Sequence, residues 1–473
     1  MIDFYPAASE IFLATAICVV LLVDVFLRDE QRMITYWLSM LALLGTAACT
    51  AIFFVDEPVT TFYGSFVADP AAGVLKLVAY AVVALAFVYS RDYLVQRNLF
   101  KGEFFVLCLF GLLGIMVMIS AHSLLTVYLG LELLSLSLYT LVAFNRESAT
   151  AAESAMKYFV LGAIASGTLL YGISLLYGVT GTVEISVLAE RVSGPDGVSI
   201  PALVGLAFIV VGVAFKFGAV PFHMWVPDVY QGAPTPVTLY IGSAPKIAAF
   251  ALAWRVLVEG LGDAHSSWQG MLIVLSILSL IIGNVVAIAQ TNLKRMLAYS
   301  TISHVGFILM GFIAGTDDAL SAAMFYTVSY VIMAAAAFGM IILLSRDGFE
   351  AERLEDFKGL NARSPWFAFV MLMIMFSMAG VPPFIGFYAK LLVLGGLIDA
   401  GLLWLAVLGV LLAVVGAFYY VRVVWFMYFA DPLDETPISA PASMRFVLSA
   451  NGLGLLALGV FPGYLLELCT RVL

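Results

Sequence analysis

The chain has 473 residues, of which 63% are hydrophobic and 11% are charged, and its formal net charge is −9. Soluble domains carry about 25% charged and about 45–50% apolar residues, so this composition excludes a soluble protein and indicates an integral membrane protein. The basic residues form no single patch, the 4 cysteines lie far apart without a Cys-x-x-Cys pair, and no glycine-rich phosphate loop is present. We therefore expect no nucleic-acid partner, no metal site and no cofactor bound to this chain.

Apolar runs long enough to cross a bilayer follow one another along the whole chain. Runs of about 18 or more apolar residues predict membrane spans, and we find about fourteen, so the predicted fold is all-α. The first run is long and lacks a small-residue cleavage site, which indicates a retained span. The spans begin near Ala7, Ile34, Ala71, Phe104, Ser123, Ser154, Ile200, Val237, Met271, Arg295, Ala319, Pro365, Leu402 and Phe446.

Basic residues are distributed unevenly between the loops. Loops that face the cytoplasm carry an excess of lysine and arginine. The even-numbered loops and the two tails carry only Arg191 and Arg471, whereas the odd-numbered loops carry all the other lysines and arginines that lie outside the spans. We therefore expect the odd-numbered loops to face the cytoplasm and both termini to lie on the opposite side. The odd-loop residues are Arg28, Arg32, Arg91, Arg97, Lys101, Arg146, Lys294, Arg295, Arg346, Arg353, Lys358, Arg363 and Arg445.

Two apolar stretches are interrupted by proline and glycine and also carry lysine. Residues 215–246 read FKFGAVPFHMWVPDVYQGAPTPVTLYIGSAPK, and residues 375–396 read MFSMAGVPPFIGFYAKLLVLGG. Proline inside a helix removes a hydrogen bond that lipid cannot replace, so each stretch predicts a broken helix.

Paired broken helices in corresponding halves indicate an inverted repeat whose working site lies at mid-membrane. We expect two inverted five-helix repeats, covering spans 4–8 and 9–13, in segments 103–260 and 268–430. A three-helix segment, residues 1–102, precedes them, and a last span lies in residues 443–473.

Basic residues outnumber acidic ones inside the spans. A charge at bilayer depth costs roughly 2.5–3.5 kcal/mol, so such residues are usually functional or paired. An excess of positive charge suits lysines that are neutral for part of the time. The basic residues inside spans or at their ends are Lys76, Lys157, Lys216, Lys246, Arg255, Lys390 and Arg422, and the acidic ones well inside apolar runs are Asp24 and Glu132.

The deepest lysines are the strongest candidates for proton carriers. These are Lys216, Lys246 and Lys390, and the alternative for each is a side chain that reaches the membrane interface. Lys216 precedes its break and Lys390 follows its own in a span of opposite direction, so we expect these two lysines on the same side of their breaks. Glu132, in TVYLGLELLSLSLY, is either a carboxylate that sets the charge of a nearby lysine or half of a structural ion pair.

Three further residues are weaker candidates. His223 follows the first break, and His304 lies in a predicted span. Each is either a proton carrier or a hydrogen-bonded core histidine. Lys157 lies near the start of its span, where reaching the interface explains it equally well. For Lys76, near the outer end of its span, we expect that interfacial role.

Four motifs together resemble a known family. TVYLGLELLSLSLY, FKFGAVPFHMWVPDVYQGAPTPV, KRMLAYSTISHVGF and GVPPFIGFYAKLLVL look like segments of the antiporter-like membrane subunits of respiratory complex I, in the same order and at the same spans. Lysine at 390 argues against the subunit M pattern, which has glutamate there, and the end at Leu473 argues against subunit L. The pattern is most similar to the subunit N branch, the bacterial counterpart of mitochondrial subunit 2.

The resemblance implies a proton-translocating function and specific roles. Glu132 and Lys216 look like the charge pair that gates one half-channel, and Lys390 like the lysine of the other. Lys246 resembles the link toward the centre, with His304 near it. Lys157 matches a further lysine of the branch.

The resemblance also implies the setting. It is the inner membrane of a bacterium, with other membrane subunits of complex I as partners. NADH, FMN, iron–sulfur clusters and quinone would be used by other subunits, which drive the protons. Two alternatives stay open: a subunit of a multi-subunit Na⁺/H⁺ antiporter, and a structural spacer of the membrane arm that pumps nothing.

Overall fold

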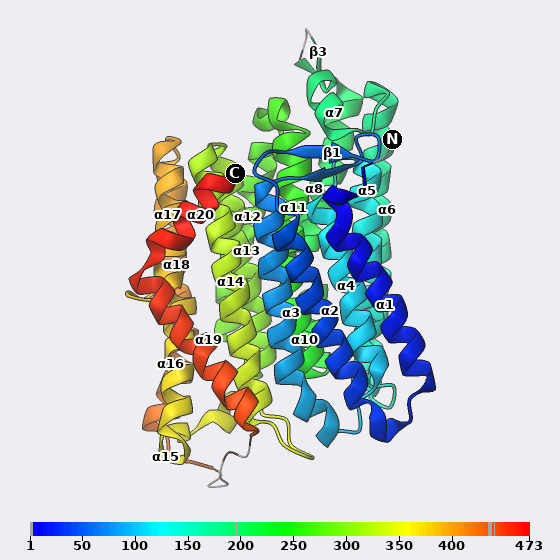
Figure 1. The fold of residues 1–473 in the computed structure, drawn as a ribbon. Helices are drawn as coiled ribbons and strands as arrows, with labels where there is room; N and C mark the ends of the chain where they lie inside the picture. Colours follow the sequence, from blue (N-terminus) through cyan, green and yellow to red (C-terminus); the bar gives the residue numbers. More distant parts are fainter. Residues whose placement is uncertain (1–2, 195–196, 434–437, 439) are drawn as a thin grey trace.

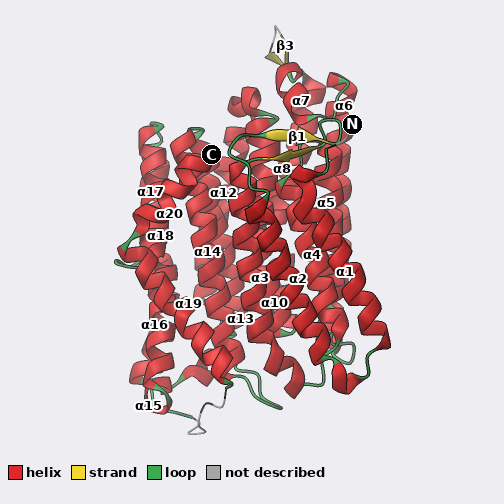
Figure 2. Cartoon of the chain, viewed as in Figure 1, coloured by secondary structure: helices red, strands yellow, loops and turns green. Residues whose placement is uncertain are grey.

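The computed structural model describes residues 3–194, 197–433, 438 and 440–473. Long helices run side by side, and two small hairpins lie at one end of the bundle (Figures 1 and 2). The helices of the first half are α1 (Ala8–Phe26), α2 (Met33–Ile52), α3 (Pro70–Gln96), α4 (Gly102–Ile119), α5 (Leu124–Val142), α6 (Ala149–Thr180), α7 (Ile185–Arg191), α8 (Ile200–Phe217), α9 (Trp225–Gly232), α10 (Thr235–Gly242) and α11 (Ala244–Ala253). A π-helical turn, η3 (Trp254–Glu259), follows α11. The later helices are α12 (His265–Ile288), α13 (Leu293–Ala314), α14 (Asp317–Leu344), α15 (Leu360–Arg363), α16 (Pro365–Ala379), α17 (Ile385–Asp399), α18 (Leu403–Phe429), α19 (Ala442–Val460) and α20 (Pro462–Val472).

Side-chain caps explain where several long helices begin. Asp69, Ser123, Ser148, Asn292 and Thr316 precede α3, α5, α6, α13 and α14, and each accepts a hydrogen bond from a backbone N–H of the first turn. Such caps satisfy donors that have no partner inside the helix. The helices therefore begin at polar residues, where the chain re-enters the apolar layer.

The number of crossings agrees with the prediction. Among the described residues, 13 helices are long and apolar enough to cross a membrane. The remaining predicted span is divided into α16 and α17, of 15 residues each, because its break falls in the middle. The all-α membrane fold with about fourteen spans is thus confirmed, whereas the repeat and the segment boundaries stay predictions.

The two ends of the bundle differ. Both termini lie toward the same end (Figure 1), as an even number of crossings requires. The antiparallel hairpin of β1 (Val59–Thr61) and β2 (Phe66–Ala68) pairs Val59 with Ala68 and lies at that end. The smaller hairpin of β3 (Ser193–Gly194) and β4 (Gly197–Val198) also lies there. The loops rich in basic residues lie at the other end, which is the asymmetry that the positive-inside rule describes.

The core lies along three central spans. The most apolar windows of Thr235–Glu259, α13 and α14 are 94% buried, against 33% for Tyr5–Phe26, α18 and α19. Peripheral helices expose apolar side chains outward, as spans in contact with lipid do. Polar groups on the central spans are therefore held away from lipid.

Candidate functional site

The first broken helix ends where a lysine from another helix replaces a missing backbone donor. Gly218, with φ 78°, closes α8 through a 2.9 Å hydrogen bond from its N–H to the carbonyl of Ala214. The residue that would donate to the Phe217 carbonyl in a continuing helix is Pro221, which has no N–H. Lys246 Nζ donates to this carbonyl instead, at 2.7 Å. The lysine side chain is only 1% exposed, so it fills a gap that water does not reach.

The second broken helix repeats this arrangement. Gly380, with φ 87°, ends α16 in the same left-handed conformation. The Pro382–Pro383 pair cannot donate to the carbonyls four residues earlier, those of Met378 and Ala379. Lys390 Nζ donates to both, at 3.2 and 2.7 Å.

Both breaks thus place an amine at the carboxyl end of a half-helix. The helix dipole concentrates partial negative charge at that end, which favours a cation there. By this contact Lys390 resembles Lys246, and the expected placement of Lys216 and Lys390 on the same side of their breaks stays a prediction. The peptide bonds Val220–Pro221 and Pro382–Pro383 are both cis.

Lys216 and Glu132 approach the same face of α5 without forming an ion pair. Lys216, 9% exposed, donates from Nζ to the hydroxyl of Ser135 at 2.8 Å. Ser135 follows Glu132 by three residues on α5, so both side chains lie on one face. The Oε1 atom of Glu132 is buried and accepts no hydrogen bond in the described part of the chain. The predicted partners are therefore neighbours, and the carboxylate keeps an unused acceptor.

His304 lies in a network of hydroxyl groups. Its Nδ1 is 2.8 Å from Tyr326 Oη, and its Nε2 is 3.0 Å from Tyr420 Oη. The Tyr420 hydroxyl also contacts that of Ser300. The imidazole is buried between α14 and α18. Each of its ring nitrogens contacts a tyrosine hydroxyl, which can donate or accept a proton. Sequence reasoning missed the tyrosines because aromatic residues in a span usually serve only packing.

The ring of Phe307 lies beside both this network and the lysine of the second break. Lys390 Nζ lies 5.3 Å from the Phe307 ring centre, and Phe307 is three residues after His304 on α13. Lys246 similarly lies 5.8 Å from the Trp225 ring centre at the first break. Each capping lysine therefore has an aromatic face beside it, a contact that favours a cation.

Lys157 belongs to an ion-pair cluster. Its Nζ lies 2.9 Å from Asp228 Oδ2 and 2.9 Å from Glu153 Oε1, and Arg295 lies 2.8 Å from the other oxygen of Asp228. The side chain of Lys157 is 45% exposed. This cluster joins α6, α9 and α13. His223 lies in the turn between α8 and α9, and its Nδ1 is buried without a hydrogen-bond partner among the described residues.

Two buried basic groups have partners that the sequence did not predict. Lys76 is buried and its Nζ lies 2.5 Å from Glu10 Oε1, while its expected position near the interface stays a prediction. Glu10 is therefore a further acidic residue inside the protein. Lys294, expected in a loop, is 3% exposed and donates to the Ala233 carbonyl at 2.7 Å. Neither pairing has a signal in the sequence, since the partners lie far apart along the chain.

Comparison with known proteins gives consistent matches. Residues 121–416 match the family described as NADH:quinone oxidoreductase/Mrp antiporter, transmembrane. The NADH-quinone oxidoreductase subunit N of Thioalkalivibrio sulfidiphilus is 58% identical over 469 residues, which are 99% of this chain and 98% of the relative. The subunit N of Thiobacillus denitrificans is 55% identical, with 100% and 98% covered. A chain of respiratory complex I from Thermus thermophilus superposes with a TM-score of 0.84 at 31% identity, covering 97% of this chain and 98% of that one.

Proposed function

Because the chain belongs to the subunit N branch of the NADH:quinone oxidoreductase/Mrp antiporter family, and so is an antiporter-like subunit of the membrane arm, we propose that it translocates protons. The observation that carries the proposal is the pair of amines, Lys246 and Lys390, that bind backbone carbonyls at the two helix breaks. An ionisable group inside a membrane is a functional site by default, and here two of them make the same type of contact with the end of a half-helix.

The proposed relay begins at Glu132 and Lys216. When the carboxylate approaches the amine, the ammonium form is favoured, and when it withdraws, burial favours loss of the proton. The unused Oε1 of Glu132 and the Ser135 hydroxyl beside Lys216 suit such a change of partner. Lys246 receives the proton next, because its contact with the carbonyl of the residue directly after Lys216 holds the two amines near each other.

The second half of the relay uses the hydroxyl network. His304 can pass a proton between its two tyrosine partners if it takes up a proton at one ring nitrogen and releases one at the other. Lys390 on α17, whose Nζ lies beside Phe307 of α13, takes up a proton from this network and releases it toward the far side. Lys157 and His223 are peripheral members, since the first is paired with two carboxylates and the second lies in the turn of the first break.

The direction and the energy source follow from the setting. Protons enter from the cytoplasmic side, at the end with the basic loops, and leave at the end that holds both termini. NADH-to-quinone electron transfer takes place in other subunits, with their FMN and iron–sulfur clusters. The energy reaches this chain as a shift of charge or conformation in neighbouring membrane subunits.

A structural rival has a specific observation in its favour. Every capping amine serves the fold by satisfying a carbonyl, so the same residues would be present in a spacer that pumps nothing. The two readings differ in one respect: a spacer needs a hydrogen-bond donor at these positions, whereas a pump needs a group that also releases its proton.

The first test uses the pair on α5 and α8. Glu132→Gln and Lys216→Met are introduced into the whole complex, and NADH-driven proton uptake is measured in inside-out membrane vesicles. Both variants should assemble but lose most proton translocation and the quinone reduction coupled to it. Thr140→Val, on the outer face of α5, is the control, because its hydroxyl bonds only to its own helix. Normal pumping in correctly assembled Glu132 and Lys216 variants would exclude the relay.

A further inference from the structure

A buried ion pair lies outside the relay, in the N-terminal three helices. Lys76 on α3 and Glu10 on α1 are 2.5 Å apart, and their side chains are 4% and 8% exposed. The hydroxyl of Ser9 donates to the other carboxylate oxygen of Glu10 at 2.9 Å. Both charged side chains are thus buried between α1 and α3.

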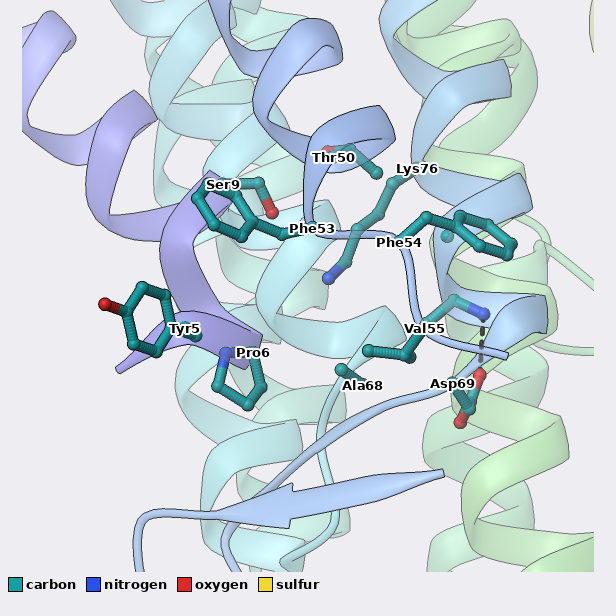
Figure 3. A pocket seen from close by; sticks show the side chains of 12 residues that line it. Tyr5, Pro6, Ser9, Thr50, Phe53, Phe54, Val55, Ala68, Asp69 and Lys76 are labelled. Carbon is teal, nitrogen blue, oxygen red and sulfur yellow. Dashed lines mark hydrogen bonds between the residues drawn. The ribbon is translucent and has the colours of Figure 1, made fainter. Parts of the chain in front are cut away.

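A small polar cavity adjoins this pair. Its volume of about 20 Å³ exceeds the roughly 10–15 Å³ that a water molecule needs. Figure 3 shows the Lys76 side chain extending into it toward the helix that carries Ser9, with Thr50 and Asp69 among the other lining residues. The 53–55 turn after α2 and residues 5–6 before α1 also line it, so the cavity lies at loop level, at the end with the termini.

The other polar groups around the pair are accounted for. On α3, Tyr80 shares a 3.0 Å hydrogen bond with Thr50 of α2. Asp69 forms a 2.5 Å ion pair with Arg255 of η3. α4 and α5 face Glu10 across a groove with apolar residues and one hydroxyl, those of Leu113, Val117, Leu133 and Thr126. Glu10 is therefore the one carboxylate in this cluster whose cation partner lines a cavity large enough for water.

Stability alone does not explain such a pair. Two buried charges cost several kcal/mol each to desolvate, and apolar residues of similar volume are often as stable or more so. A carboxylate paired with an ammonium group that contacts water can instead exchange a proton. Lys76 lines the cavity and Glu10 does not, so protons reach Glu10 through the amine. When Lys76 passes a proton to Glu10 and takes up another from cavity water, the ion pair is broken and Lys76 stays charged. The reverse transfers return one proton to water and restore the pair.

We propose that Glu10 and Lys76 form a proton-binding site, separate from the central lysines, that exchanges protons with water at the end of the bundle holding both termini. The site itself does not depend on the proposed function. Only its consequence does: if the chain pumps, this site lies on the release side, where it can accept protons that leave the relay.

Infrared spectroscopy of the purified whole complex tests the site without measuring pumping. At mildly acidic pH we expect a protonated-carboxyl band that Glu10→Gln removes and Glu10→Asp shifts. Transfer to D₂O should shift this band at once, because the cavity admits water. Ala72→Val fills the cavity and should slow that exchange about tenfold or more. Ala79→Val is the matched control, since Ala79 is equally buried on α3 but does not line the cavity.

Two results would overturn the inference. If no carboxyl band depends on Glu10 at any pH at which the complex stays assembled, the pair is permanently ionised and structural. If the band exchanges in D₂O at the same rate in Ala72→Val as in the unchanged protein, the cavity does not connect the site with water. Neither result bears on Glu132 or Lys216, so failure here is distinguishable from failure of the proposed function.

Discussion

Three substitutions of Lys246 separate its structural role from its proposed role in proton transfer. Lys246→Met removes the donor to the Phe217 carbonyl, which no backbone N–H can replace. A hydrogen bond to a charged group contributes about 1.5–3 kcal/mol, and the 1% exposure of this side chain prevents compensation by water. The substitution also removes the cost of burying a charge, which offsets part of this loss. The destabilisation caused by Lys246→Met is therefore at most about 1.5–3 kcal/mol. Lys246→Gln keeps a neutral donor, and Lys246→Arg keeps a charged donor that does not release its proton.

The assay combines stability with pumping in the whole complex. Heat inactivation of such an assembly is measured as a rate. A loss of about 1.4 kcal/mol in the barrier to unfolding raises this rate tenfold, so Lys246→Met should inactivate up to about 10–100 times faster than the unchanged protein. Lys246→Gln and Lys246→Arg should recover much of this stability. None of the three should pump protons in inside-out vesicles, because none carries an amine that titrates. Pumping at the normal rate by either donor-keeping variant would show that Lys246 is only a cap, and the relay would then be wrong.

Two further predictions concern the second break and a loop histidine. Lys390→Met should cost less stability than Lys246→Met, although it leaves two carbonyls without a donor. The Lys390 side chain is only partly buried, so water or a neighbouring subunit can donate hydrogen bonds to these carbonyls. A larger loss of stability in the same heat-inactivation assay would contradict this. Burial, followed by the charge of Arg255, lowers the pKa of His122 in the loop between α4 and α5. The unfolded chain therefore binds more protons than the folded chain below about pH 6.5. The stability of the folded state should decrease as the pH is lowered through that range. His122→Gln should lessen this acid-induced loss, and an unchanged pH dependence of heat inactivation would count against it.

The span count and the two breaks could be predicted because both depend on local sequence. Hydrophobic length sets each crossing, and Pro221 or the Pro382–Pro383 pair removes donors wherever the surrounding fold places them. Glu132, Lys216, Lys246 and Lys390 followed from the same reasoning, since a charge in an apolar run is visible without a structure.

What could not be predicted is which groups meet. The contact of Lys246 with the carbonyl of Phe217 joins residues 29 positions apart in sequence, and that of Glu10 with Lys76 joins α1 to α3. Hydropathy placed Lys294 in a loop, just before an apolar run. The sequence does not show that another segment of the chain covers this end of the helix and buries the lysine. The order of residues along the chain also does not show that Lys390, like Lys246, binds the carbonyls at the end of a half-helix.

The capping contacts offer a physical link between proton movement and helix movement. A charged amine bonds a carbonyl with about 1.5–3 kcal/mol, whereas a neutral donor contributes about 0.5–1.5 kcal/mol. When Lys246 or Lys390 loses its proton, the end of its half-helix is therefore held about 1 kcal/mol less tightly. Arg422 caps the carboxyl end of α12 through the carbonyls of Ile288 and Gln290, but arginine keeps its proton, so that end stays fixed. If the chain translocates protons as proposed, lysine caps the two half-helix ends that must move, and arginine caps a helix end that must stay fixed.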